Sequence, residues 1–131
     1  MKRVIRILII VSFSIAACTE EIKEIKTSDL SAYNMKIIPD HPASHDQIKL
    51  IIYDDCTYNV LKRVDRDGQF IVIEKQFNSM MKWPCIMEND TIDMGKLPSG
   101  NYILHYKLTD ISTQVSNPEV LSLFFNLKVT E

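Results

Sequence analysis

The sequence predicts an all-β domain, built as a sandwich of two sheets with about seven strands. Three observations support this fold class. Apolar and polar residues alternate over much of residues 35–131, as expected for strands that bury one face. No sustained 3.6-residue pattern with helix caps follows residue 18. Turn residues interrupt the alternation at short intervals, and this spacing is typical of a sandwich.

The last two predicted strands have the clearest pattern. The even-numbered positions of residues 101–110 share one face, and the odd-numbered positions of residues 120–130 share another. The apolar sets are Tyr102, Leu104, Tyr106 and Leu108 in the first segment, and Leu121, Leu123, Phe125, Leu127 and Val129 in the second. Alternation of this length predicts two long strands, each with one buried side.

Five shorter strands are predicted before them. Pro39 ends the first strand, and a loop follows at 41–45, where prolines exclude regular structure. Residues 65–68 read Asp-Arg-Asp-Gly and form a turn, so residues 57–77 are predicted as a hairpin. Residues 78–89 are irregular. The five strands cover residues 35–39, 47–53 (with Ile48, Leu50 and Ile52 on one face), 57–64, 69–77 and 91–94.

Residues 1–17 have the pattern of a signal peptide, with a basic start, an apolar middle and small residues at the end. The apolar stretch is shorter than the roughly 20 residues that a membrane span needs. Ile15-Ala16-Ala17-Cys18 resembles the lipobox of bacterial lipoproteins. The resemblance implies cleavage before Cys18, which then carries acyl chains such as palmitate. The alternative is an ordinary secretory signal, cleaved nearby.

Cleavage before Cys18 would leave 114 residues, enough for one small domain. The three basic residues of the signal leave with it, so 12 basic residues face 17 acidic ones and the formal charge becomes −5. An acidic chain without a basic stripe argues against nucleic-acid binding. Membrane attachment is therefore expected from the lipid alone.

Residues 18–34 are charged and poor in aromatic residues, which predicts a flexible acidic tether. The acidic pair Glu20-Glu21 resembles an export signal with which some Gram-negative anaerobes send lipoproteins to the outer face of the outer membrane. The resemblance implies a lipid anchor in the outer membrane of a Gram-negative bacterium, with the domain exposed at the cell surface. The alternative is a solvated linker.

Once Cys18 is assigned to lipid, Cys56 and Cys85 remain as an even pair in an exported chain. Oxidising compartments favour disulfides, so we expect these two residues to pair. The bond would tie the end of the second strand to the irregular segment after the hairpin. Two free thiols are the alternative, and the absence of a Cys-x-x-Cys spacing argues against redox catalysis.

The hexapeptide Leu97-Pro98-Ser99-Gly100-Asn101-Tyr102 resembles the tyrosine corner of immunoglobulin-like domains. The resemblance implies that Tyr102 bonds back to upstream backbone near the start of the penultimate strand. It also extends the predicted fold class to an immunoglobulin-like sandwich over residues 35–131. The antibody-type cysteine is missing, because position 104 is Leu. A plain hairpin turn is the alternative.

No motif in the chain predicts catalysis, a cofactor or a metal. His41 and His45 are four residues apart, but Pro42 between them excludes a helical zinc pair, and His105 falls on an outward face. The Asp-Arg-Asp-Gly run at 65–68 begins like a calcium loop but lacks the later ligands, and Asp54-Asp55 is interpreted as a strand end. Three glycines in the whole chain exclude a phosphate-binding loop.

Two further features are candidate sites. Asp90-Thr91-Ile92 resembles the O-glycosylation acceptor of the same anaerobes, with Thr91 as the modified residue. An apolar cluster is a candidate partner surface. The alternative is that Trp83 and Met81 cap one end of the sandwich and shield the disulfide. The cluster comprises Phe77, Met80, Met81, Trp83 and Met87.

The sequence therefore predicts a non-catalytic, lipid-anchored binding module of the cell envelope, with an adhesive or accessory role. Its partner, a protein or a glycan, would contact the end loops near 41–45 and 78–89. One alternative is a protein inhibitor or envelope assembly factor that acts through the same loops. A small hydrolase is disfavoured, since no catalytic motif supports it.

Overall fold

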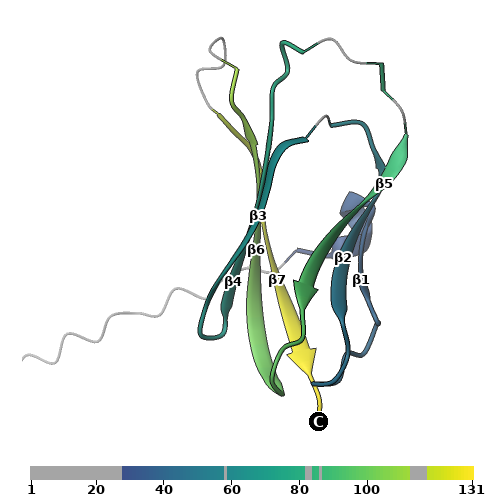
Figure 1. Ribbon diagram of the computed structural model, residues 1–131, viewed down its shortest axis with the longest axis vertical. Helices are drawn as coiled ribbons and strands as arrows, with labels where there is room; N and C mark the ends of the chain where they lie inside the picture. Colours follow the sequence, from purple (N-terminus) through teal and green to yellow (C-terminus); the bar gives the residue numbers. More distant parts are fainter. Residues whose placement is uncertain (1–27, 58, 82–83, 86, 113–117) are drawn as a thin grey trace, which may run out of the picture.

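A computed structural model describes residues 28–57, 59–81, 84–85, 87–112 and 118–131. The predicted signal peptide, Cys18, the Glu20-Glu21 pair and Trp83 lie outside these residues. The described chain contains seven strands in two sheets, which confirms the predicted all-β sandwich (Figure 1). In these ranges no helix is long and apolar enough to cross a membrane.

The two sheets differ in size. The three-stranded sheet has the order β1-β2-β5, and the four-stranded sheet has the order β3-β4-β6-β7. The first contains β1 (Met35–Ile38), β2 (Ile48–Asp55) and β5 (Glu88–Gly95). The second contains β3 (Asn59–Asp67), β4 (Phe70–Phe77), β6 (Gly100–Asp110) and β7 (Glu119–Val129).

The strand order shares some features with an immunoglobulin constant-type domain and departs from it at β3 and β4. In such a domain the third strand neighbours the sixth, and the fourth belongs to the other sheet. Here β4 lies between β3 and β6 and runs parallel to β6, while the other paired strands are antiparallel. The placement of β1-β2-β5 and of β6 beside β7 matches the immunoglobulin arrangement.

The buried faces of the strands are those that the alternation predicts. Their side chains fill the space between the sheets, and Ile48, Leu50 and Leu104 are completely buried. The Tyr102 hydroxyl donates a hydrogen bond to the backbone oxygen of Pro98 at 2.7 Å, as the tyrosine-corner resemblance implies. The core residues are Met35, Ile37, Ile48, Leu50, Ile52, Ile71, Ile73, Ile92, Met94, Leu97, Tyr102, Leu104, Tyr106, Leu123, Phe125, Leu127 and Val129.

Several boundaries differ from the prediction. β2 extends to Asp55, and β5 begins at Glu88, inside the segment predicted as irregular. The turn of the β3–β4 hairpin is only two residues long, Gly68-Gln69, and Gly68 has a φ of 57°. Strand β3 therefore includes both aspartates that the prediction assigned to the turn, Asp65 and Asp67. A two-residue hairpin turn favours a glycine at positive φ. Leu30–Tyr33 form a 3-10 turn, η1, inside the segment predicted as tether. The backbone N–H of Ser28 also bonds to Phe124 at 2.7 Å, so contacts with the domain begin before Met35.

The sandwich has two chemically distinct ends. Strands β2, β4 and β6 end at the disulfide end, where β3, β5 and β7 begin. The register there pairs Phe77 with Asn59 and with Asp110, and pairs Asp55 with Glu88. The C-terminal end holds the β1–β2, β3–β4 and β5–β6 connections and the C-terminus (Figure 1). The loops at 41–45 and 78–89 therefore lie at opposite ends, and the expectation that they serve one partner together is wrong.

Candidate functional site

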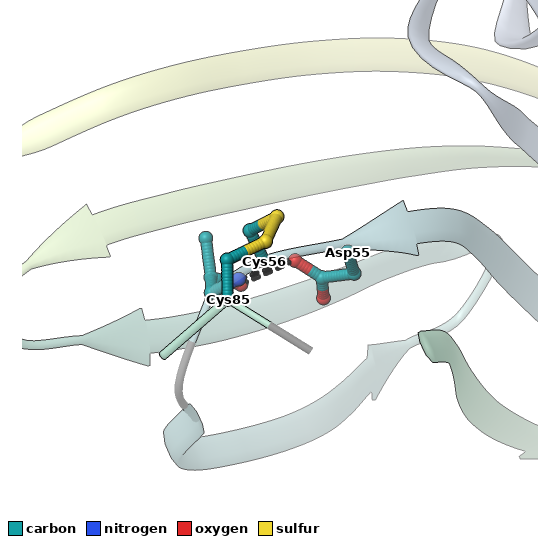
Figure 2. The surroundings of a disulfide bond; sticks show 4 residues. Asp55, Cys56 and Cys85 are labelled. Carbon is teal, nitrogen blue, oxygen red and sulfur yellow. Dashed lines mark hydrogen bonds between the residues drawn. A yellow bond between two sulfur atoms is a disulfide. The ribbon is translucent and has the colours of Figure 1, made fainter. Parts of the chain in front are cut away.

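Cys56 and Cys85 form a disulfide at the disulfide end, with their Cα atoms 4.9 Å apart (Figure 2). Cys56 directly follows β2 and Cys85 lies in the β4–β5 connection, as predicted. Both residues are exposed. Met81 is also exposed, at 40%. The alternative in which Trp83 and Met81 together shield the bond stays a prediction, because Trp83 lies outside the described residues.

Large apolar side chains are exposed on the strand ends and connections at this end of the sandwich. We call this group the apolar end surface: it comprises Val60, Leu61, Met80, Met81, Met87, Ile111 and Val120. It includes three residues of the cluster that the sequence analysis predicts, and Met87 is the most exposed, at 70%. Phe77, a fourth member of that cluster, is half-buried at the end of β4. Exposed apolar residues gathered at one end of a small domain favour contact with a partner.

The same end holds a charge cluster formed by Lys62, Lys75, Asp55 and Asp90, in which every side chain except that of Lys62 is at most 10% exposed. We call it the buried charge cluster. Lys75 is only 1% exposed; its Nζ contacts Asp55 Oδ2 and lies 3.1 Å from Asp90 Oδ2. Lys62 reaches the same site from β3, with its Nζ 2.6 Å from Asp90 Oδ1. Two ammonium groups thus face two carboxylates, which satisfies the requirement that buried charges be paired.

Strand alternation explains why two of these residues point inward. Lys75 is in phase with the buried residues Ile71 and Ile73 of β4, and Asp90 is in phase with Ile92 and Met94 of β5. A charged residue at such a position is directed between the sheets. The inward-facing Lys and Asp are thus visible in the alternation.

Asp55 reaches the cluster because of an irregularity in β2. Even-numbered residues of this strand face the core up to Ile52, so an unbroken alternation would direct Asp54 inward. Asp54 instead has a φ of 51°, and the register with β5 shifts between Ile52 and Asp55. A bulge of this kind re-aims the next side chain. Asp55 consequently meets Lys75 and also accepts bonds from the backbone and hydroxyl of Thr57.

Burial and charge shift the pKa values of this cluster. Removal from water lowers the pKa of Lys75, although Asp90 opposes this effect by favouring the charged amine. Burial alone would raise the pKa of Asp90, but the hydrogen bonds from Lys62 and Lys75 outweigh it and lower the pKa. Burial, reinforced by the charge of Asp90, raises the pKa of Tyr106. Burial therefore favours the neutral amine of Lys75, and Asp90 stays ionised.

The remaining polar candidates do not converge. His41 and His45 are exposed at the C-terminal end, and His105 stacks on Phe124 with ring centroids 4.1 Å apart. Among the described residues, no three groups of the metal-binding types come together. A cavity of about 610 Å³ includes Asp29, Asp40 and His41, but both carboxylates are engaged locally, by Ser31 and Lys36.

Thr91 is exposed on β5, an edge strand, so its hydroxyl is accessible. Its O-glycosylation stays a prediction, which mass spectrometry of the native protein tests.

None of the four charged residues is among the site residues predicted from the sequence. The in-phase positions of Lys75 and Asp90 are the signal that could have revealed them, whereas the bulge conceals Asp55. The chain matches no protein-family model, no curated protein and no solved structure.

Proposed function

We propose that the protein is a lipid-anchored binding module of the bacterial cell envelope, which contacts a partner protein through the apolar end surface. The observation that carries the proposal is the gathering of exposed apolar side chains at the disulfide end. The lipobox-like Ile15-Ala16-Ala17-Cys18 supports the anchor. The disulfide suits an oxidising compartment outside the cytoplasm.

The chemistry of this end favours a protein partner over a glycan. Methionine side chains are unbranched and adaptable, and they pack against apolar surfaces of varied shape. The chain presents three of them here, Met80, Met81 and Met87, each at least 40% exposed. The disulfide joins the end of β2 to the β4–β5 connection, which carries all three of these residues, so it gives the flexible side chains a fixed base.

Site-specific photo-crosslinking in living cells tests the contact. A photoreactive residue at Met81 or Met87 is expected to give a discrete adduct, and the same residue at exposed His45, on the opposite end, is expected to give none. Met80→Ser together with Met87→Ser should weaken the adduct from Met81 about tenfold. Equal adducts from both ends, or none from either, would contradict a binding role for this surface.

The anchor is tested separately with Cys18→Ser. Without the thiol there is no site for the thioether-linked lipid, so the protein should move from the membrane to the soluble exported fraction. Metabolic labelling with a palmitate analogue should mark the wild-type chain and not the variant. Retention of the variant in the membrane would refute the lipid anchor. Protease treatment of intact cells then distinguishes an outward-facing domain, which is cut, from a periplasmic one.

A further inference from the structure

The buried charge cluster has a property that the binding role does not need. Lys75 extends from β4 of one sheet, and Asp55 ends β2 of the other, so their contact bridges the two layers of the sandwich. Both side chains are almost fully removed from water, at 1% and 8% exposed. A primary amine and a carboxyl group held in contact in a water-poor site are the two reactants of amide formation.

We propose that Lys75 and Asp55 join through an intramolecular amide bond between Nζ and Cγ, and that Asp90 relays the proton. In the reaction the Nζ–Cγ bond forms and one Cγ–O bond of Asp55 breaks. The oxygen leaves with two protons as water, and no oxidant, reductant or activated co-reactant is required. An ammonium and a carboxylate are consumed together, so the net charge of the cluster does not change.

The arrangement of charges favours the neutral reactants. Proton transfer from Lys75 to Asp55 produces a free amine and a carboxylic acid, which are the forms that a low-dielectric site prefers. Asp90 does not compete as the acid, because Lys62 stays bonded to its Oδ1 at 2.6 Å. Lys62 and Asp90 thus remain as an ion pair, while Lys75 and Asp55 react as an uncharged pair.

Asp90 is placed to move the proton. Its Oδ2 lies 3.1 Å from Lys75 Nζ, the atom that must lose a proton when it attacks Cγ. The same oxygen accepts a bond from the Asn59 amide at 3.2 Å, so the carboxylate is held from both sides. Asp90 would accept the proton from Nζ and deliver it to the leaving oxygen of Asp55. Fixed contact of this kind replaces the chance encounter that makes uncatalysed amide formation slow.

The bond would also resolve the cost of the buried charges. A buried ion pair gains little over uncharged groups, because both ions lose their hydration. The amide removes one pair and replaces it with a covalent link between the sheets, at the end where the disulfide joins the β2–β3 and β4–β5 connections. The inference does not depend on the proposed partner, and its test involves no binding measurement.

Peptide mapping of the full-length protein, reduced and alkylated, tests the bond without any variant. Trypsin does not cut after an acylated lysine, so residues 50–62 and 67–82 should be recovered as one branched peptide, lighter than the two peptides by one water molecule. Fragmentation should place the link between Asp55 and Lys75. Separate peptides 50–62, 67–75 and 76–82 from the folded protein would overturn the proposal.

Three variants then assign the roles. Asp55→Asn should lose ammonia instead of water and give the identical branched peptide, whereas Asp54→Asn, its exposed neighbour, should leave the link unchanged apart from its own substitution. Asp90→Asn should slow formation by about 10²–10⁴-fold if its carboxylate relays the proton. A branched peptide that forms at the wild-type rate in folded Asp90→Asn, as judged by circular dichroism, would refute the role of Asp90.

Discussion

The two ends of the sandwich are held together by different chemistry. At the C-terminal end the core is closed by apolar packing, with Leu97 and Val129 each 2% exposed, and by backbone hydrogen bonds between Thr130 and the β1–β2 loop. At the disulfide end, the Cys56–Cys85 bond and the four residues of the buried charge cluster lie where the C-terminal end has apolar packing. The first end resembles an ordinary domain interior, and the second exposes apolar side chains while it buries polar ones.

This difference relates stability to function. Apolar side chains that one end of the domain exposes cannot also be buried to stabilise the fold. The disulfide end therefore needs another source of cohesion, which the disulfide and the charge cluster supply. Variants that weaken each end separately can test this division, and the largest effects are expected where charges are buried.

Lys75→Met is expected to have the largest effect. The substitution leaves the buried carboxylate of Asp55 with no cation among its described contacts, and it removes any bond between the sheets at this point. Breaking a buried pair by removal of one partner costs about 3–5 kcal/mol. Urea denaturation should show this loss in the free energy of unfolding. The matched control is Lys62→Met: its side chain is 37% exposed, so we expect a loss of about 1 kcal/mol. Equal losses in the two variants would contradict the special position of Lys75.

Removal of the disulfide should have the next largest effect. The bond closes a loop with a sequence separation of 29, for which loop entropy predicts about 3.5 kcal/mol. The double variant Cys56→Ala/Cys85→Ala avoids a free thiol and should lower the free energy of unfolding by that amount. If the charge cluster also holds this end of the sandwich together, the loss will be smaller than loop entropy predicts. If removal of the disulfide lowers the free energy of unfolding more in the Lys75→Met background than in wild type, the two links support one another.

The contrast between the ends also marks how far the sequence can be used. At the C-terminal end, alternation alone predicts the buried residues correctly, because Tyr102, Leu104 and Val129 are in phase with their neighbours and are buried. The same alternation would place Asp54, and not Asp55, toward the core. The backbone irregularity at Asp54 reverses this choice, and no residue type in the segment signals it.

Strand order was likewise beyond the reach of the sequence. A hairpin at 57–77 is predicted from its turn residues, but the parallel pairing of β4 with β6 joins segments that are adjacent only in the fold. Local pattern carries no information on which edge of a hairpin meets the next strand. The charge cluster depends on this pairing, because the pairing sets the position of β4 in the sheet, and β4 carries Lys75. Its assembly therefore required the structure.

A pH titration tests the contribution of the Asp90 charge at the disulfide end, and its expected effect on stability is smaller than that of removing the disulfide. Burial opposes the shift, but the hydrogen bonds from Lys62 and Lys75 lower the folded-state pKa of Asp90 below its ordinary value, so the folded form favours the carboxylate. The resulting stability is complete above the unfolded pKa and is lost as pH falls through the folded pKa. As pH falls through the unfolded and then the folded pKa, the difference in the free energy of unfolding between wild type and Asp90→Asn should therefore shrink. A difference that is constant with pH would show that Asp90 gains nothing from its charge.

Tyr102→Phe should give the smallest effect, and it tests the C-terminal end. The substitution keeps the buried ring and removes only the hydroxyl that bonds to Pro98 O. A single neutral hydrogen bond contributes about 1 kcal/mol, so the free energy of unfolding should fall by that amount. Tyr53→Phe is the matched control, because this ring is 37% exposed and the hydroxyl can bond to water; its loss should be close to zero. If Tyr102→Phe instead cost as much as Lys75→Met, the tyrosine corner would be as decisive for the fold as the charge cluster, and the two ends would not differ in the way their chemistry indicates.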